Sequence, residues 1–215
     1  MKKESQLHTI LYRGKLSTEK TKKYWLHLII RRTVFVEIKR IIQEISNALD
    51  SLIQSGLVHR DLNGENIIIR DDGSITLLDI DSLAGVDGEN VDREFYQGNH
   101  LTMSPEAANH SISPTSDIFS LGVLVLTEYF AAEVRNIVGI ATLDEFANAP
   151  HSRAITRGTS APETRTRMRQ LKQTYPEELR DEIHGLLEFL IEALQPHAKD
   201  RPMTGSQVRQ LLEAF

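Results

Sequence analysis

Residues 59–81 read HRDLNGENIIIRDDGSITLLDID, and they contain the most informative pattern in the chain. Two short runs of mainly aliphatic residues, Ile67–Arg70 and Ile75–Leu78, lie on either side of Asp71–Ser74. Runs of this kind favour strands, and an Asp-Gly pair between them is a strong signal for a hairpin turn. The stretch therefore predicts a short β-hairpin.

Polar side chains stand at the open end of this predicted hairpin. If Arg70 faces Ile75 across the turn, Asn66 faces Asp79, and the Cα atoms of opposed residues lie about 5 Å apart. An amide oxygen and a carboxylate suit Mg²⁺ that carries a nucleotide, because this ion keeps phosphate and water ligands beside one or two protein carboxylates. Asp61 precedes Asn66 by five residues, and a carboxylate held there could accept the proton of an attacking hydroxyl.

Helical spacing surrounds the hairpin. Residues 35–55 carry aliphatic side chains at steps of three and four, which predicts an amphipathic helix that ends at Gly56. The segment Asp117–Phe130 is apolar on nearly every side, so it predicts a buried helix. Either Thr115 or Ser116 could cap that helix.

The same spacing recurs at Leu179–Leu194 and Gly205–Phe215, with Pro196 and Pro202 between the two predicted helices. Residues 148–166 are rich in Ser, Thr, Arg, Pro and Ala, and we expect a long exposed loop there. The whole pattern predicts an α+β fold that is mostly α: a helical bundle with one short β-hairpin.

The composition is that of an ordinary folded domain. The 215 residues include 25 Lys and Arg against 30 Asp and Glu, a formal charge of −5, so we expect neither nucleic acid nor a membrane as a partner. The absence of cysteine excludes disulfides, thiolate catalysis and cysteine-ligated metals. No signal peptide and no apolar segment of membrane-spanning length is present, so we expect a cytoplasmic protein.

Five motifs, in the same order, resemble those of the protein kinase superfamily, in particular the eukaryotic-type serine/threonine protein kinases. Residues 59–66, His-Arg-Asp-Leu-Asn-Gly-Glu-Asn, resemble the catalytic loop. The other four motifs are Asp79-Ile80-Asp81 at the metal-binding Asp-Phe-Gly, Ser104-Pro105-Glu106 at Ala-Pro-Glu, residues 116–122 at the central helix, and Lys199-Asp200-Arg201-Pro202 at the late arginine motif. The resemblance implies a kinase C-terminal lobe over residues 35–215, after an N-terminal segment, 1–34, with a possible hinge remnant.

The resemblance also implies a function, which is transfer of the γ-phosphoryl group of ATP, with Mg²⁺, to a hydroxyl of a protein substrate. Asp61 would be the catalytic base, while Asn66 and Asp79 would hold the metal and its nucleotide. Asp81 replaces the family's glycine and could be a third metal ligand. Asn63 replaces a lysine that stabilises the transferring phosphoryl group, and it is placed with Asp61 among the catalytic residues.

Five further residues have structural or regulatory roles by the same resemblance. His59 would be a packed scaffold of the catalytic loop, and Asp117 would anchor the backbone of that loop. Glu106 and Arg201 would form a buried ion pair. Arg60 would meet a phosphate on the segment after the hairpin.

That segment is acidic in this chain, and we expect one of its carboxylates to pair with Arg60 without phosphorylation. Its acidic residues are Asp87, Glu89, Asp92 and Glu94. Ser82 and Tyr96 are the hydroxyls available between Asp79 and Asn99.

The chain departs from the family pattern before His59. The 58 preceding residues contain neither a glycine-rich loop nor the phosphate-binding lysine that the N-terminal lobe of a complete kinase supplies. A separate chain could supply these parts, the sequence could be a truncated copy, or the lobe could work without them. Leu7–Tyr12 could be the last strand of that lobe.

Two other functions stay open. The missing parts favour a pseudokinase-like scaffold, which would hold a partner protein and lack catalysis of its own. A small-molecule phosphotransferase of the aminoglycoside or choline type shares an Asp-x-Asp metal motif and an Asp-Leu-Asn loop. Glu106 and Arg201 argue against this last class, which lacks the protein-substrate segment.

Overall fold

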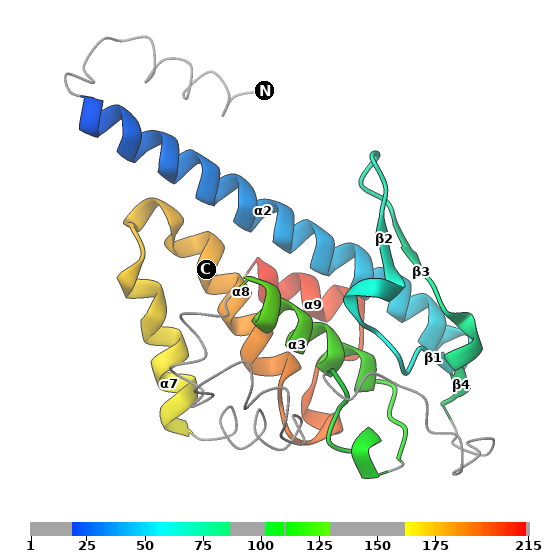
Figure 1. Cartoon of the computed structure of the whole chain (residues 1–215). Coiled ribbons are helices and arrows are strands. Elements are labelled where there is room, and N and C mark those ends of the chain that lie inside the picture. The colour runs from blue at the N-terminus through cyan, green and yellow to red at the C-terminus, as the bar shows by residue number, and fades with distance from the viewer. Residues whose placement is uncertain (1–18, 87–101, 110, 130–161, 214–215) are drawn as a thin grey trace.

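The computed structural model describes residues 19–86, 102–109, 111–129 and 162–213. The helices and strands of this part are α2 (Glu19–Gln54), β1 (Leu57–Val58), β2 (Ile67–Ile69), β3 (Ile75–Leu77), β4 (Ala84–Gly85), α3 (Ser116–Tyr129), α7 (Pro162–Leu171), α8 (Arg180–Ala193) and α9 (Gly205–Leu212). Figure 1 shows α2 running the length of the molecule, with the β2–β3 hairpin at one end. This mostly helical architecture with a short hairpin confirms the predicted fold class.

Single 3₁₀ turns connect several of these elements. They lie at Gly64–Asn66, Ile80–Ser82, Ala107–Asn109, Lys172–Thr174, Glu177–Leu179 and Ala198–Asp200. The first two flank the hairpin, so each of the two loops that were predicted to carry chemistry contains a short helical turn.

The long helix α2 contributes buried side chains to the core along much of its length. Its buried side chains recur at helical spacing, at Leu28, Phe35, Ile38, Ile42, Ile45 and Leu49. The helix begins at Glu19, and the prediction that it begins near residue 35 was wrong. Leu28 continues the apolar stripe seven residues before Phe35, and no glycine or proline interrupts the intervening turns. The helix therefore passes through residue 34, where the sequence suggested a division.

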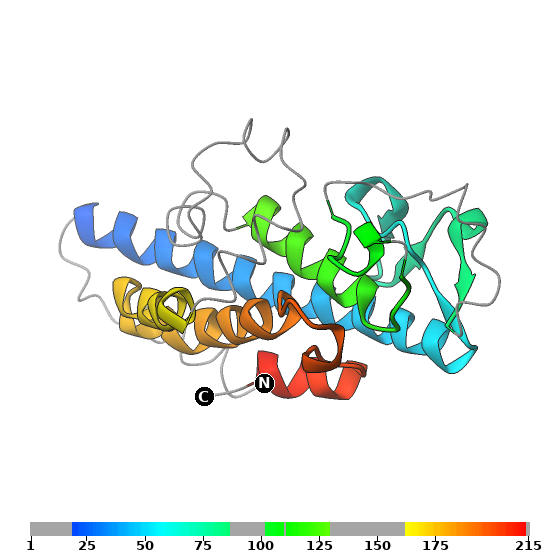
Figure 2. The same ribbon diagram turned by 90° about the horizontal axis from the view of Figure 1, so that it is seen from below.

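The helices α3, α8 and α9 fill the space beside α2. In Figure 2, α8 lies between α3 and α9. A Cβ atom at Gly185 of α8 would overlap the carbonyl oxygen of Leu212, and one at Gly122 of α3 would lie 3.0 Å from Leu194 Cδ2. Glycine at these two positions thus allows the close approach of the helices.

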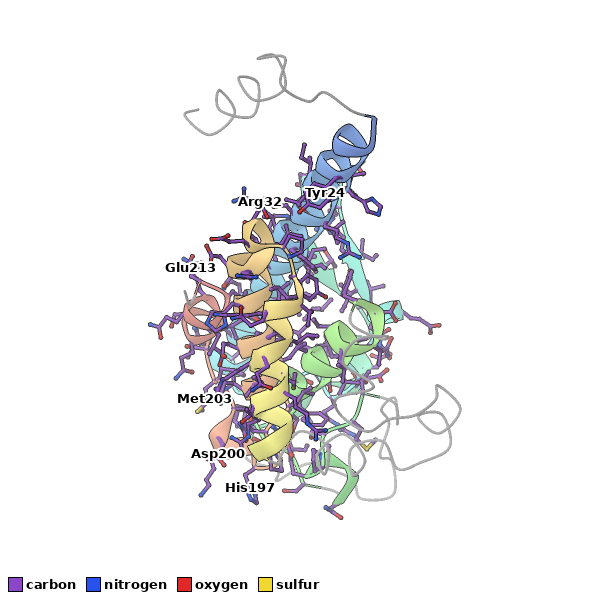
Figure 3. All side chains as sticks on the ribbon, turned by 90° about the vertical axis from the view of Figure 1, so that its left-hand side faces the viewer. Tyr24, Arg32, His197, Asp200, Met203 and Glu213 are labelled. Carbon is purple, nitrogen blue, oxygen red and sulfur yellow. The ribbon has the colours of Figure 1, made fainter. Side chains whose placement is uncertain are left out.

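The outer side of the bundle carries ion pairs between helices. Figure 3 shows Arg32 of α2 beside α8, and its Nε donates to Glu182 Oε1 of α8 at 2.8 Å. Arg169 of α7 pairs in the same way with Glu188 of α8 at 2.9 Å. Within the described residues, no helix combines the length and the apolar character that crossing a membrane requires.

The hairpin forms as predicted, but its register differs by one residue. Ile69 lies opposite Ile75, and the N–H of Arg70 donates to Ser74 O at 2.9 Å. The loop therefore has three residues, and Gly73 adopts the left-handed position at its end, with φ +83°. The predicted pairing of Arg70 with Ile75 was wrong, because it assumed a loop of four residues.

This shift changes which residues lie opposite one another at the open end of the hairpin. The N–H of Leu78 donates to Asn66 O at 2.9 Å, so Asn66 lies opposite Leu78 and not opposite Asp79. Because side chains alternate along a strand, Asn66, Ile68 and Leu78 share the solvent face of the hairpin. Ile67 points the other way and packs against the core.

Two predicted segments, the loop over residues 148–166 and the strand Leu7–Tyr12, lie partly or wholly outside the described residues. Residues 162–166 of the predicted exposed loop belong to α7, so that part of the prediction was wrong. Residues 148–161 lie outside the described residues, as does Leu7–Tyr12.

Candidate active site

The loop that carries Asp61 is fixed at its start by Asp117, in the first turn of α3. The N–H of His59 donates to Asp117 Oδ2 at 2.7 Å, and the N–H of Arg60 donates to Oδ1 at 2.9 Å. Asp117 is buried. Burial raises the pKa of this carboxyl, and the two N–H groups act in the opposite direction. The structure thus contains the anchor that the sequence suggested.

Asp117 also holds a strained backbone in place. Arg60 has φ 73° and Asp79 has φ 60°, and within the described part of the chain these are the non-glycine residues at positive φ. The left-handed conformation costs a non-glycine residue about 1 to 2 kcal/mol, so surrounding bonds must fix it. Both residues lie in the loops that were predicted to carry chemistry. The carboxylates expected to pair with Arg60 lie outside the described residues.

Asp61 and Asn66 come together at the two ends of this loop. Asn66 Nδ2 donates to Asp61 Oδ2 and to Asp61 O, at 2.9 Å in each case. Both residues are half-buried. The amide of Asn66 therefore orients the carboxylate of Asp61, and its Oδ1 atom takes no part in these two bonds.

Asn63 lies inside the loop. Its Oδ1 accepts the N–H of Glu65 at 2.9 Å and of Asn66 at 3.3 Å, while its Nδ2 donates to Asp61 O at 3.2 Å. The Oδ1 end of the amide thus caps the 3₁₀ turn that begins at Gly64, and the Nδ2 end ties this side chain to the backbone of Asp61. This buried side chain shapes the loop, and its placement among the catalytic residues stays a prediction.

The loop after β3 is tied to the first loop by His59 and Ser82. His59 is 1% exposed, and its Nε2 donates to Leu78 O at 2.7 Å. The buried hydroxyl of Ser82 lies 2.8 Å from His59 O and 2.7 Å from Asp79 O. The sequence suggested that Ser82 was an available hydroxyl, which is wrong because it is enclosed between the two loops.

Asp79 and Asp81 both expose their side chains to solvent. Among the described residues, no group of three or more His, Cys, Asp or Glu side chains is arranged to hold a metal ion. The donors that the sequence indicated are one amide and two carboxylates, and Mg²⁺ suits such a small set because it keeps water and phosphate ligands. The ligand roles of Asn66, Asp79 and Asp81 stay predictions.

Glu106 and Arg201 form the ion pair that the sequence suggested. Arg201 Nη1 donates to Glu106 Oε1 at 2.6 Å, and Nη2 donates to Oε2 at 2.9 Å. The hydroxyl of Ser116 donates to the same Oε1 at 2.8 Å. Burial acts to raise the pKa of Glu106, but the hydrogen bonds and charge of Arg201 outweigh it and hold the pKa below its ordinary value.

The side chain of Arg201 is buried, and it makes further hydrogen bonds and a contact with an aromatic ring. Its Nε donates to Gln195 O at 2.8 Å, and its guanidinium lies over the ring of Phe119, with 4.8 Å between Cζ and the ring centroid. The hydroxyl of Thr115 donates to Ala198 O at 2.8 Å. These contacts attach the segment that carries Glu106, and the start of α3, to the C-terminal part of the chain.

Comparison with known proteins identifies the arrangement. A family model described as the protein kinase domain matches residues 2–210. Serine/threonine-protein kinase PknL of Mycobacterium tuberculosis is 30% identical over 123 residues, which are 55% of this chain and 31% of that protein. Serine/threonine-protein kinase PAK 1 of Mus musculus is 31% identical over 91 residues, which are 42% of this chain and 17% of that protein.

A third relative is serine/threonine-protein kinase STE20 of Eremothecium gossypii, which is 31% identical over 91 residues. These are 42% of this chain and 9% of that protein. The matched parts thus span less than a third of the length of each of these three relatives.

Proposed function

Because the chain belongs to the protein kinase family, we propose that it transfers the γ-phosphoryl group of ATP to a serine or threonine hydroxyl of a protein substrate. The observation that carries this proposal is the bond from Asn66 Nδ2 to Asp61 Oδ2, in the loop that lies beside Asp79. The serine/threonine-protein kinases among its relatives support the class of acceptor. A cytoplasmic location stays a prediction from the sequence.

Asp61 is the group that receives the proton of the attacking hydroxyl. Its carboxylate is oriented by Asn66, so one rotamer is favoured before any substrate arrives. The Oδ1 atom of Asn66 and the carboxylate of Asp79 would hold Mg²⁺, with Asp81 as a further candidate. When bound, this ion neutralises charge on the phosphate oxygens.

An aliphatic surface beside these groups suits the rest of a nucleotide. Ile68 and Leu78 expose 44% and 37% of their surface, on the same face of the hairpin as Asn66. Ile80, which precedes Asp81, is 70% exposed. A base could bury this apolar surface while the phosphates reach the oxygen ligands, and mixed apolar and polar sites of this kind are typical of nucleotide pockets.

Residues 1–58 contain two glycines, Gly14 and Gly56, and so no glycine-rich loop. We include in the proposal that the chain binds Mg-ATP and transfers its phosphoryl group without these parts at a reduced rate, and that a further polypeptide segment, in this protein or in a separate chain, raises that rate by supplying the phosphate-binding lysine and the cover of the nucleotide. This same observation favours the second candidate function, a pseudokinase-like scaffold. The bidentate bond between Glu106 and Arg201 supports a protein-kinase lobe over a small-molecule phosphotransferase.

A transfer assay tests the proposal. The purified chain is incubated with radiolabelled ATP, Mg²⁺ and a pool of serine- and threonine-containing peptides. Asp61→Asn keeps the size of the side chain and an acceptor for Asn66, so we expect intact folding and a loss of transfer of at least about 100-fold. Asp71→Asn, at an exposed carboxylate of the hairpin turn, is the control and should transfer at the wild-type rate.

Three results would contradict the proposal or its details. Equal transfer by the wild type and Asp61→Asn would remove Asp61 as the base. Retained ATP binding without transfer to any peptide would favour the scaffold. Transfer to choline or an aminoglycoside in place of peptides would point to the small-molecule class.

A further inference from the structure

We infer that Ser82 is a positioning residue, whose buried hydroxyl fixes the orientation of Asp79 and couples it to the loop that carries Asp61. This inference rests on the proposed function, because it concerns the same Mg-nucleotide site. No motif of the sequence assigned Ser82 such a role, and the residue is 4% exposed.

Hydrogen bonds from His59 and Ser82 hold the backbone on both sides of the Asp79 Cα atom. The carbonyl before it, Leu78 O, accepts from His59 Nε2 at 2.7 Å, and its own carbonyl lies 2.7 Å from Ser82 Oγ. Both peptide units that flank the Asp79 Cα atom are therefore held. Fixing both units fixes φ and ψ of Asp79 at 60° and 57°, a conformation that the residue would otherwise leave readily.

The side chain of Asp79 depends on this backbone for its direction. It is exposed, and it makes no capping hydrogen bond to the 3₁₀ turn that follows it. The backbone conformation therefore sets the direction of its Cα–Cβ bond, and with it the positions that the carboxylate can reach. A carboxylate that binds Mg²⁺ must meet near-ideal octahedral geometry, so a change in this direction weakens the ligand.

Ser82 also links the two loops. Ser82 Oγ also lies 2.8 Å from His59 O, and a hydroxyl has one proton, which it shares between these two carbonyls. The N–H of His59 is held by Asp117, and Asp61 follows two residues later. Ser82 thus joins the backbone of Asp79 to the anchored start of the catalytic loop, and it sets the spacing of Asp61 and Asp79.

A magnesium titration tests the inference. MgCl₂ is titrated into the chain with a fluorescent ATP analogue, and anisotropy reports the bound fraction. We expect the Mg²⁺ midpoint of Ser82→Ala to rise about tenfold or more, the range for removing a group that orients a metal ligand. Ser82→Thr keeps the hydroxyl and should bring the midpoint back toward the wild-type value.

Ser46→Ala is the matched control. Ser46 is 1% exposed and donates a hydroxyl bond of 2.8 Å to Ile42 O within α2. It should lower the melting temperature about as much as Ser82→Ala and leave the Mg²⁺ midpoint unchanged. Equal midpoints for Ser82→Ala and Ser46→Ala would overturn the inference alone, whereas a wild type with no Mg²⁺-dependent binding would overturn the proposed function and the inference together.

Discussion

Glu106 and Arg201 lie 95 residues apart in the sequence and are joined by two parallel hydrogen bonds, at 2.6 and 2.9 Å. The Arg201 side chain has no exposed surface, and that of Glu106 is 17% exposed. The pair fixes the segment around Glu106 to the turn before α9. Its removal should therefore affect the stability of the whole domain.

Glu106→Gln leaves the guanidinium of Arg201 buried without its counter-charge. Breaking one partner of a buried pair costs about 3 to 5 kcal/mol, and we expect the lower end because Glu106 is partly exposed. Urea denaturation measures the free energy of unfolding. Glu188→Gln, which breaks the pair with the exposed Arg169, is the control and should cost about 1 kcal/mol or less. Equal losses for the two variants would contradict this assignment.

The same pair predicts a pH dependence. The folded-state pKa of Glu106 is lowered, so the unfolded state binds more protons and the stabilisation is lost as the pH falls. It is fully present above the unfolded pKa, about 4.3, and disappears as the pH passes through the folded pKa below that value. The difference in unfolding free energy between wild type and Glu106→Gln should be constant near neutral pH and shrink in acid. A difference that stays constant or grows in acid would show the opposite sign of the shift.

Asp117→Asn should release the start of the catalytic loop. An asparagine retains one acceptor oxygen, so one of the N–H groups of His59 and Arg60 would face an NH₂ group. We expect a loss of about 1 to 3 kcal/mol of stability and faster hydrogen exchange at these two amides, measured by NMR. Asp72→Asn, whose exposed carboxylate accepts the N–H of Ser74, is the control. Unchanged protection at His59 and Arg60 would contradict the anchor.

Gly185→Ala tests the packing of α8 on α9. The added methyl group would overlap the carbonyl oxygen of Leu212, and overpacking of this kind costs about 1 to 3 kcal/mol. Gly64→Ala meets nothing within 4 Å and should change the free energy of unfolding by less than 1 kcal/mol, about the effect of a surface substitution. Thermal unfolding of the two variants compares them directly. A Gly185→Ala variant as stable as the wild type would mean that the helices have room to separate.

The sequence predicted which segments are helices and which are strands, because local residue patterns determine these structures. The spacing of aliphatic residues marked α3, α8 and α9 to within a few residues, and Asp-Gly marked the hairpin. The register was missed because the conformation of Gly73, which sets the loop length, is decided by the paired strands. The start of α2 was missed because, among the side chains that the structure describes between residues 19 and 30, Leu28 alone is buried.

The residues of the candidate site also differ in how far the sequence could predict their roles. The sequence singled out Asp61, Asn66 and Asp117 because their spacing resembles a known family. In the structure, Asn66 donates a hydrogen bond to Asp61, and Asp117 accepts the N–H of His59 at the start of the same loop. Ser82 was misjudged because its burial depends on two loops that meet only in three dimensions. The capping role of Asn63 had a local signal, since asparagine is a preferred residue before a helical turn.

A nucleotide site that depends on Asp79 is tested by calorimetric titration of the purified chain with ATP, with and without Mg²⁺, beside Asp79→Ala. Asp72→Ala, which removes an exposed carboxylate of the hairpin turn, is the matched control. We predict Mg²⁺-dependent binding by the wild type and by Asp72→Ala, and none by Asp79→Ala. Equal binding by the wild type and Asp79→Ala would contradict the metal assignment, and no binding by the wild type would contradict a nucleotide site in this lobe alone.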